Sequence, residues 1–402
     1  MKSIYDGVSL FSGGLDSILA ARLLADQGLR MLCLHFWSPF FGTPSSSARD
    51  RWKRLYGLEV EALDCSREMA ALVSGWPPHG FGKVMNPCVD CKILLLRLAK
   101  KRMEELGAKF IATGEVMGQR PMSQRRDVLN TIRREAGVDG LLLRPLSALH
   151  LDPTPMEESG LVDRSKLLGI HGRGRQDQLA LAKAYGMEEI PSPGGGCWLA
   201  ERENARRYWP IRTRLGSPSA ADYRLAAWGR QYWLVTADQA CWLVMGRNSY
   251  DNETLKKSQE QEDLLAGVCD YPGPLALLRR GRSWTAEARR LAAAMLASYA
   301  PKAVQAGGEI GVWMKERSGI QSVVRVLPDM ERIGFTRMTF DEVKAEKHLE
   351  ASRHQAEENL ERERRRRERL ERKAAEPAPS AGEAGESQPA GAKPDSPPEQ
   401  GS

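Results

Sequence analysis

A glycine-rich hexapeptide at residues 12–17, SGGLDS, sets the strongest constraint on what this chain can fold into. An apolar run at 8–11 precedes it and a helical pattern at 18–24 follows it, so the order is strand, glycine turn, helix. Two adjacent glycines let the backbone turn tightly with its amide N–H groups pointing outward, and the amino end of a helix favours an anion. The pattern therefore predicts a phosphate-binding loop formed by Ser12, Gly13, Gly14, Leu15, Asp16 and Ser17.

Asp16 is the unusual member of this loop, because a carboxylate repels a polyphosphate. A divalent cation between the two removes the repulsion, so Asp16 is a candidate Mg²⁺ ligand and catalytic residue. The loop is not a Walker A motif, since no Gly-Lys-Ser/Thr follows it. The structural alternative is a helix N-cap in a glycine turn, with Asp16 as an early-helix charge.

Further apolar runs of strand length occur at 31–36, 60–63, 110–113 and 141–143, with helical patterns between them. Alternating strands and helices imply right-handed crossovers and a doubly wound parallel sheet of the α/β class. Ligands bind such sheets at the carboxyl ends of the strands. We expect this domain to cover residues 1–215.

The rest of the chain divides by composition. Residues 217–340 are rich in tryptophan and contain strand-like runs at 232–236 and 241–245, which predicts a smaller α+β module. Residues 341–373 are dense in Glu, Arg and Lys, which favours an exposed charged helix. Residues 374–402 are Pro, Ala, Gly, Ser and Glu, a composition typical of a disordered tail.

The charge of the chain points to a polyanionic partner. The formal net charge is +7, and residues after Phe340 sum to a small negative charge, so the folded part carries the basic surplus. A merely soluble basic surface is the alternative. No apolar run approaches the roughly 18 residues of a membrane span, and no export signal opens the chain, so we expect a cytoplasmic protein without a membrane partner. The sequence does not indicate an oligomeric state.

Three of the seven cysteines stand in informative positions. Cys88 and Cys91 lie one turn apart at the expected amino end of a helix, where free amides lower thiol pKa values. Cys197 follows a Pro- and Gly-rich loop that can bend toward them. Such thiols suit an iron–sulfur cluster with one open iron, a persulfide on Cys197 that is resolved as a disulfide, or structural zinc. The cluster is favoured, because no CxxC or HxxxH partner for zinc occurs.

Several motifs in order resemble the PP-loop domain of tRNA thiouridine synthases, and most closely the 4-thiouridine synthase group, over about residues 3–200. They are SGGLDS at 12–17, NPCVDC at 86–91, ATGE at 112–115, GQRPMSQ at 118–124 and PSPGGGC at 191–197. The resemblance implies a fold of the adenine nucleotide alpha hydrolase (HUP/PP-loop) type, with Thr113, Gly114 and Glu115 beside the nucleotide. It also implies that Cys88, Cys91 and Cys197 handle sulfur, and that they hold a 4Fe–4S cluster.

The implied activity is that of an ATP- and Mg²⁺-dependent tRNA sulfurtransferase. Such an enzyme adenylates a uridine carbonyl and replaces its oxygen with sulfur, here at position 4 in preference to position 2. Sulfide or a cysteine desulfurase would supply the sulfur. His35, at the end of the second expected strand, is a candidate neighbour of adenine. Candidate RNA contacts, each with a solvated helix or loop face as its alternative, are Gln119, Arg120, Arg125, Arg126, Arg173 and Arg175.

Two alternative functions share some of these features. An amide-forming PP-loop ligase would keep adenylation and leave the three cysteines without a purpose. A non-catalytic RNA- or ribosome-binding protein with a degenerate nucleotide site is suggested by MGRN at 245–248 and Asn252-Glu253, which resemble the NFACT RNA-binding domain. Four tryptophans are expected to pack in the core rather than to stack on bases: Trp198, Trp209, Trp228 and Trp233.

Overall fold

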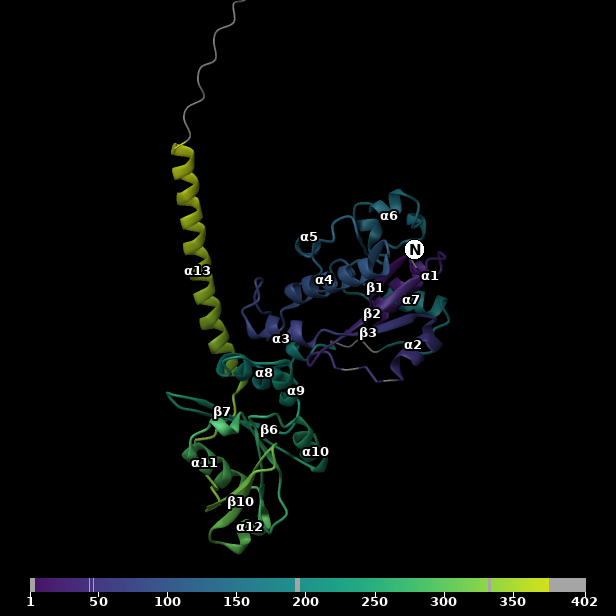
Figure 1. The fold of residues 1–402 in the computed structure, drawn as a ribbon. Helices are drawn as coiled ribbons and strands as arrows, with labels where there is room; N and C mark the ends of the chain where they lie inside the picture. The colour runs from purple at the N-terminus through teal and green to yellow at the C-terminus, as the bar shows by residue number, and fades with distance from the viewer. Residues whose placement is uncertain (1–3, 43, 46, 192–195, 332–333, 376–402) are drawn as a thin grey trace, which may run out of the picture. The chain divides into compact units, whose positions relative to one another are not determined.

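The first part of the protein is built on a five-stranded parallel sheet with the order β3-β2-β1-β4-β5 (Figure 1). The structure is a computed structural model that describes residues 4–42, 44–45, 47–191, 196–331 and 334–375. The expected parallel α/β sheet is confirmed, and each strand lies within one residue of its expected bounds. The strands are β1 (Gly7–Leu10), β2 (Met31–Trp37), β3 (Glu59–Asp64), β4 (Phe110–Thr113) and β5 (Leu142–Leu143).

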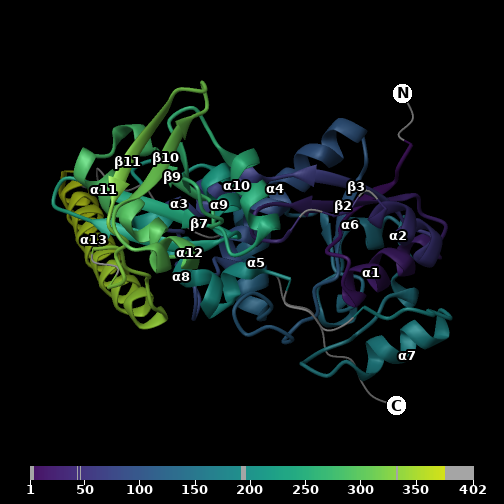
Figure 2. The same cartoon turned by 90° about the horizontal axis from the view of Figure 1, so that it is seen from below.

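Helices cover both faces of this sheet because successive strand side chains point to opposite sides. Val8 and Leu34 pack in one apolar cluster with residues of α3 and α4, whereas Phe11 and Cys33 pack with residues of α1 and α2. Figure 2 shows the same elements from below. The helices are α1 (Leu15–Ala25), α2 (Ala48–Tyr56), α3 (Ser66–Ser74), α4 (Cys88–Leu106), α5 (Arg126–Glu135), α6 (Pro155–Glu158) and α7 (Gln176–Ala184).

The strand order reverses beside β1, and this reversal places the candidate site. From β1 the chain builds outward through β2 and β3, and it then returns to add β4 on the other side of β1. Leu10 at the end of β1 is in register with Thr113 at the end of β4. Because ligands of open α/β sheets bind where the strand order reverses, the segments after Leu10 and Thr113 occupy the favoured position.

A second, antiparallel sheet follows, with the order β11-β10-β8-β9-β7-β6. It confirms the expected α+β module, while the boundary near residue 216 stays a prediction. Trp233 and Trp242 stack on neighbouring strands with ring centroids 5.4 Å apart. The elements are α8 (Arg202–Arg214), α9 (Ala220–Ala226), β6 (Arg230–Val235), β7 (Ala240–Met245), α10 (Ser249–Ser258), β8 (Leu264–Val268), β9 (Ala276–Arg279), α11 (Ala286–Ala297), α12 (Pro301–Ala306), β10 (Ile310–Glu316) and β11 (Gln321–Val326).

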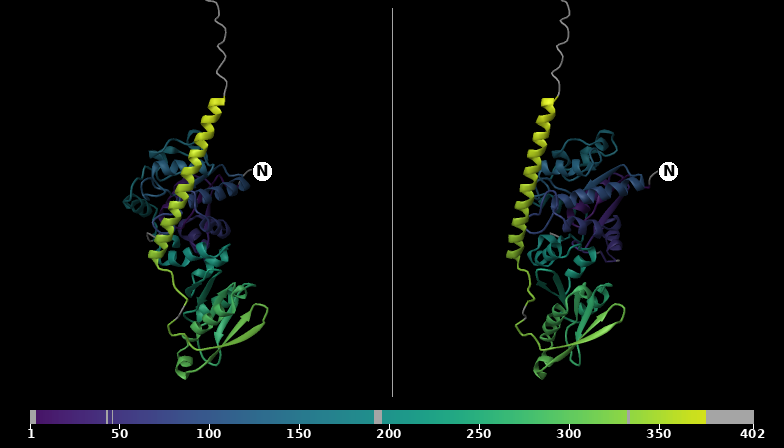
Figure 3. Two further views of the ribbon diagram at one scale, coloured as in Figure 1. Left: turned by 90° about the vertical axis from the view of Figure 1, so that its left-hand side faces the viewer. Right: turned by 60° about the vertical axis from the view of Figure 1, so that its left-hand side comes forward.

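One long charged helix, α13 (Phe340–Ala375), ends the described chain (Figures 1 and 3). Contacts divide the chain into two units, Met1–Lys347 and His348–Ser402, so the first two turns of α13 belong with the sheets. The expected disordered tail falls mostly on residues 376–402, which lie outside the described residues. No described helix combines the length and the apolar character that crossing a bilayer requires.

Candidate functional site

The hexapeptide forms the expected turn between β1 and α1. Gly13 has a φ of +77°, a conformation that glycine adopts without strain. The Ser17 hydroxyl donates to the Gly14 carbonyl at 2.8 Å, and the Gly14 N–H donates to the Ser12 hydroxyl at 3.3 Å. Helix α1 begins at Leu15 with no side-chain cap on its first turn. The loop therefore presents backbone donors and a helix amino end at the carboxyl edge of the sheet.

The segment after β4 packs directly against this loop. A Cβ atom added to Gly114 would lie 2.5 Å from the Asp16 carbonyl oxygen, a distance that no side chain tolerates. Glycine is thus required at position 114 because two backbones meet there. Gly114 accordingly lies beside the loop, and the expectation that Thr113, Gly114 and Glu115 border a nucleotide stays a prediction.

Among the described residues, only one of the two Asp16 carboxylate oxygens has a hydrogen-bond donor. Its Oδ2 accepts a hydrogen bond from Gln119 Nε2 at 3.1 Å. Its Oδ1 is buried and accepts no hydrogen bond from any described residue. A buried carboxylate oxygen in this state fits a cation ligand better than a structural cap, since buried acceptors are normally paired.

Glu115 occupies a buried ion network. Its carboxylate is 2.9 Å from Arg144 Nε, 3.3 Å from Lys92 Nζ and 3.2 Å from the Thr113 hydroxyl. Burial raises the pKa of Glu115, but Lys92 and Arg144 outweigh burial and lower the pKa to about 2. Lys92 directly follows Cys91, so this network joins the segment beside the phosphate loop to the cysteine helix.

The rings of His35 and Trp52 pack against each other next to the loop. The His35 Nδ1 lies 3.0 Å from the Phe11 carbonyl oxygen, and the two ring centroids of His35 and Trp52 are 4.9 Å apart. Burial lowers the pKa of His35, which keeps its ring neutral at neutral pH. Trp52, from α2, also lies within 3.2 Å of a Cβ position at Gly13. Sequence reasoning missed Trp52, because nothing in its local pattern distinguishes it from a helix residue that packs on the sheet.

Cys88 and Cys197 both lie near enough to Cys91 to raise the pKa of its thiol. Cys88 opens α4, and its Sγ accepts from Asn86 Nδ2 at 3.1 Å. Burial raises the pKa of the Cys91 thiol, and the nearby Cys197 raises it further. Burial also raises the pKa of Cys197, to about 11. The expectation that the helix amides lower the thiol pKa values is therefore wrong for Cys91, since burial outweighs them.

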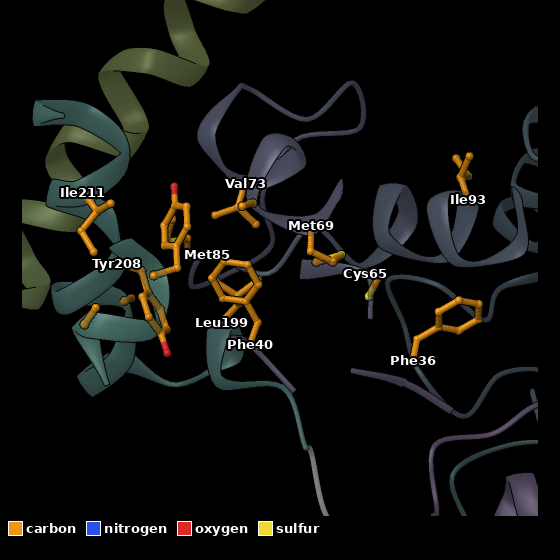
Figure 4. Close-up of a cluster of buried hydrophobic side chains, with 14 of the residues drawn as sticks. Phe36, Phe40, Cys65, Met69, Val73, Met85, Ile93, Leu199, Tyr208 and Ile211 are labelled. Carbon is orange, nitrogen blue, oxygen red and sulfur yellow. The ribbon is translucent and has the colours of Figure 1, made fainter. Parts of the chain in front are cut away.

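The two segments that carry the cysteines, one before Cys88 and one after Cys197, pack in one apolar cluster (Figure 4). Met85, just before the CxxC, and Leu199, just after Cys197, are fully buried in it with Phe40 and Tyr208. The Met85 N–H donates to the Leu199 carbonyl at 3.1 Å. Residues 192–195 of the Pro-Gly loop lie outside the described residues. Among the residues that are described, no three His, Cys, Asp or Glu side chains are gathered as a metal site.

Residues 118–124 connect the loop with the cysteines. Gln119 donates to Asp16, as noted above, and the adjacent Arg120 lowers the pKa of the Cys197 thiol against the larger effect of burial. Met122 Sδ lies 3.5 Å from Asn86 Nδ2, the group that also donates to Cys88. One short segment therefore touches both halves of the candidate site.

The basic residues expected to contact RNA are distributed over two neighbouring loops. His171 forms a β-bridge with Met117, so the loop that carries Arg173 and Arg175 lies beside the segment 118–124. Arg125 and Arg126 are exposed and pair with Asp127 at 2.8 Å and Asp152 at 3.7 Å. Their charge is partly neutralised. Of the four tryptophans, Trp209 and Trp233 are buried as expected, whereas Trp198 and Trp228 are half-buried.

Lys347, in the first turns of α13, binds the backbone of the segment that leads into the CxxC; we call this contact the Lys347 clamp. Its ammonium donates to the carbonyl oxygens of Gly82, Lys83 and Val84 at 2.6, 2.8 and 2.8 Å. Burial lowers the pKa of Lys347. This contact could not be predicted from sequence, because Lys347 lies in a run of charged residues that is typical of a solvated helix.

Comparison with known proteins finds similarity in the first part of the chain. Residues 3–152 match the family described as thiamine biosynthesis protein (ThiI), which confirms the resemblance over β1 to β5. A probable tRNA sulfurtransferase of Thermococcus kodakarensis is 27% identical over 171 residues, which cover 40% of each chain. One from Methanosarcina mazei is 32% identical over 126 residues, or 28% of each chain. The chain thus matches at most two fifths of the length of these relatives.

Solved structures give only a faint likeness. A U34-tRNA thiolase, NcsA, from Methanococcus maripaludis with its [4Fe-4S] cluster has 13% identity and a TM-score of 0.28, over 56% of this chain and 71% of that one. A predicted tRNA methyltransferase subunit from Methanocaldococcus jannaschii has 14% identity and a TM-score of 0.33, over 55% and 92%. These scores do not establish a common fold. The likeness of residues 245–253 to the NFACT domain stays a prediction.

Replacing Glu115 with Gln tests the buried network through its pH dependence. The folded pKa of about 2 lies below the usual 4.5, so the ionised carboxylate stabilises the fold above pH 4.5, and this contribution is lost as the pH falls toward 2. We expect E115Q to lose about 3 kcal/mol of unfolding free energy at pH 7, measured by urea denaturation. The difference from the parent should shrink below pH 4.5. The control E104Q, at an exposed carboxylate, should have nearly the same unfolding free energy as the parent. A loss of unfolding free energy in E115Q that does not depend on pH would contradict the buried network.

Replacing Lys347 with Met tests the clamp. Three carbonyl oxygens lose a charged donor, so we expect the free energy of unfolding to fall by about 2 kcal/mol. The loosened segment should also make Cys88 react faster with a thiol reagent in the folded protein. K344M is the control, because Lys344 is exposed and the contacts of its ammonium are with Asp341 and the Phe340 ring of the same helix. Equal stability and equal Cys88 reactivity in the two variants would rule the clamp out.

Proposed function

We propose that this protein is an ATP-dependent tRNA sulfurtransferase, which adenylates a uridine carbonyl oxygen and replaces it with sulfur, at position 4 of the base. The names of its relatives and the family match support sulfur transfer to tRNA. The observation that carries the proposal is the segment 118–124: Gln119 contacts Asp16, and Met122 contacts Asn86, the residue that donates to Cys88. A nucleotide and a sulfur carrier held by one segment can act on one base.

The phosphate loop supplies the site for ATP. Outward backbone N–H groups and the amino end of α1 would hold the phosphates, and the orphaned Asp16 Oδ1 would bind the Mg²⁺ that screens them. The neutral His35 ring and Trp52 would border the adenine. ATP dependence is supported by this geometry and by the resemblance of the loop to those of ATP pyrophosphatases.

The proposed reaction has two steps. The uridine carbonyl oxygen attacks the α-phosphorus of ATP, and pyrophosphate leaves. A sulfur nucleophile then attacks the activated ring carbon, and AMP leaves with the former carbonyl oxygen. With hydrosulfide, no atom changes oxidation state. With a persulfide on Cys197, a second thiol attacks Cys197 Sγ, the terminal sulfur stays on the base, and the resulting disulfide requires an external thiol reductant.

The burial of the thiols has a consequence for sulfur transfer. A raised pKa means that Cys91 and Cys197 hold their protons at neutral pH in the structure described. Arg120 favours the thiolate of Cys197. RNA phosphates that engaged Arg120 would weaken this effect, whereas a metal would deprotonate the thiols outright.

Cys88, Cys91 and Cys197 fit a 4Fe–4S cluster by the chemistry of their donors. They are soft ligands from two segments that one apolar cluster anchors. When bound, a cluster with three protein ligands supplies an open iron at which sulfide can bind. The protein's contribution would be to hold the half-buried Cys91 and Cys197 against the apolar cluster, with Arg120 near Cys197.

Iron analysis distinguishes a cluster from cysteine persulfide chemistry. We expect anaerobically purified protein to contain about four irons and as many acid-labile sulfides per chain, with a broad visible absorption. C88S should lose iron, whereas C269S should keep it, because Cys269 lies in the second module and outside the cysteine site. An iron-free protein that still transfers sulfur would exclude the cluster.

Two substitutions separate adenylation from sulfur transfer. Anaerobic incubation with ATP, Mg²⁺, sulfide and unmodified tRNA is followed by assays of pyrophosphate and of thiouridine. D16N should lower both products by at least about 100-fold, because the cation site is lost. C197S should abolish thiouridine while pyrophosphate release continues. C269S is the matched control and should match the parent.

Three outcomes would contradict this function. Pyrophosphate release without sulfur in the RNA, in the parent protein, would leave adenylation for another nucleophile, as in an amide-forming ligase. Full thiouridine formation in a variant lacking Cys88, Cys91 and Cys197 would remove the cysteines from the chemistry. Tight RNA binding with no turnover of ATP would indicate a non-catalytic RNA-binding protein.

A further inference from the structure

A group of arginines surrounds a small hollow that lies between α8 and the second module. Residues of α8, of β6 and of the segment before α13 line it (elements in Figure 1). The lining residues are Arg206, Arg207, Gln231, Trp233, Arg337 and Met338. Three guanidinium groups around one hollow repel one another, so this arrangement needs a compensating partner.

The hollow carries a surplus of positive charge. Arg207 is half-buried and donates to backbone carbonyls, at 2.5 Å to Ala226 and 3.0 Å to Gly229. Burial lowers the pKa of Arg207, and Arg247, Arg206 and Arg337 lower it further, which shows how close the four cations lie. Among the described residues, ion pairs to this group come from Glu203, to Arg206, and from Asp251, to Arg247.

A buried donor without an acceptor lies at the same place. Trp233 is 1% exposed, lines the hollow, and has an indole Nε1 that donates to no described residue. Its stacking partner Trp242 is satisfied, because its Nε1 donates to Gln231 Oε1 at 2.6 Å. Buried N–H donors are normally paired, and the hollow, with a volume of about 10 Å³, has room for one water as the acceptor.

An exposed aromatic surface adjoins the hollow. Tyr250 is 66% exposed and packs edge-on against Trp228 with centroids 5.4 Å apart. The Trp228 carbonyl accepts from Arg207 at 3.4 Å, and Arg247 lies three residues before Tyr250. Guanidinium groups beside an exposed aromatic ring are the pattern by which proteins bind a phosphate and stack the neighbouring base of single-stranded RNA.

We propose that Arg206 and Arg337, beside the hollow, bind one backbone phosphate of an unpaired RNA segment, and that Tyr250 is a stacking surface for an adjacent base. This proposal deepens the proposed function, on which it rests for the choice of tRNA as the RNA. It assigns the second module a role in holding the substrate. A free phosphate ion would use the same guanidinium groups without Tyr250.

RNA binding by the full-length protein at a series of salt concentrations tests the proposal. Fluorescence anisotropy with a labelled tRNA transcript would compare the parent with the double variant R206Q/R337Q. The control R317Q/R325Q removes the same charge from exposed arginines near β11, the strand at the opposite edge of the sheet from β6. We expect R206Q/R337Q to weaken binding about tenfold and to reduce the salt slope by about 1 to 2, relative to the control.

Further variants keep the test decisive. The Arg337 guanidinium also lies over the Tyr232 ring, at 5.7 Å, so R206Q alone is measured in case the double variant is less stable. Y250A should weaken RNA binding without changing the salt slope. If the double variant and R206Q bind tRNA like the control, the proposal is overturned. It is also overturned if inorganic phosphate alone raises the melting temperature through these arginines while RNA affinity is unchanged.

These outcomes are independent of catalysis. If the protein binds tRNA through these arginines but forms no thiouridine, the RNA-binding site is supported and the proposed function is contradicted. If the protein forms thiouridine while both arginine variants bind tRNA normally, the proposed function is supported and the RNA-binding site is contradicted.

Discussion

The contact between Gly114 and the backbone of Asp16 fixes the candidate site. With 2.5 Å between a Cβ position and the Asp16 carbonyl oxygen, only glycine lets the segment after β4 reach the phosphate loop. This approach places Gln119 against the Asp16 carboxylate and Glu115 in its buried network. The strand-order reversal beside β1 brings the two segments together, and the glycine allows them to touch.

From that contact, two physical links lead to the thiols. The first is electrostatic, since Glu115 holds Lys92, the residue next to Cys91. The second is the packing of Met85 and Leu199 in one apolar cluster, which joins the two cysteine segments (Figure 4). Buried ion pairs and well-packed apolar clusters are rigid features, so the relative position of loop and thiols is held by the protein.

Much of this arrangement could be predicted from local sequence pattern. The strands of the parallel sheet are short apolar runs, and the phosphate loop has an unmistakable glycine pair, so both follow from rules that act over a few residues. The three cysteines could be selected because a CxxC at a helix start is a local signal. The stacking of Trp233 on Trp242 and the burial of Trp209 follow the general preference of tryptophan for cores.

The remainder depends on contacts between residues far apart in the chain. Trp52 comes to the loop because α2 packs on the sheet, and Lys347 reaches the Cys88 segment across more than 250 residues. The pKa values of Cys91 and Cys197 depend on burial, which a helix-start pattern does not report. The arginine hollow likewise joins α8 with β6 and residues before α13, and no single stretch of sequence contains it.

The fate of the uridine carbonyl oxygen is the most direct measure of whether loop and thiols act on one base. A tRNA substrate that carries ¹⁸O at the carbonyl to be replaced is incubated with ATP, Mg²⁺ and sulfide, and the AMP is analysed by mass spectrometry. Adenylation of the base predicts one ¹⁸O in AMP for each thiouridine formed. AMP that carries no label, while thiouridine accumulates, would show that the nucleotide never activated the base and would contradict the shared site.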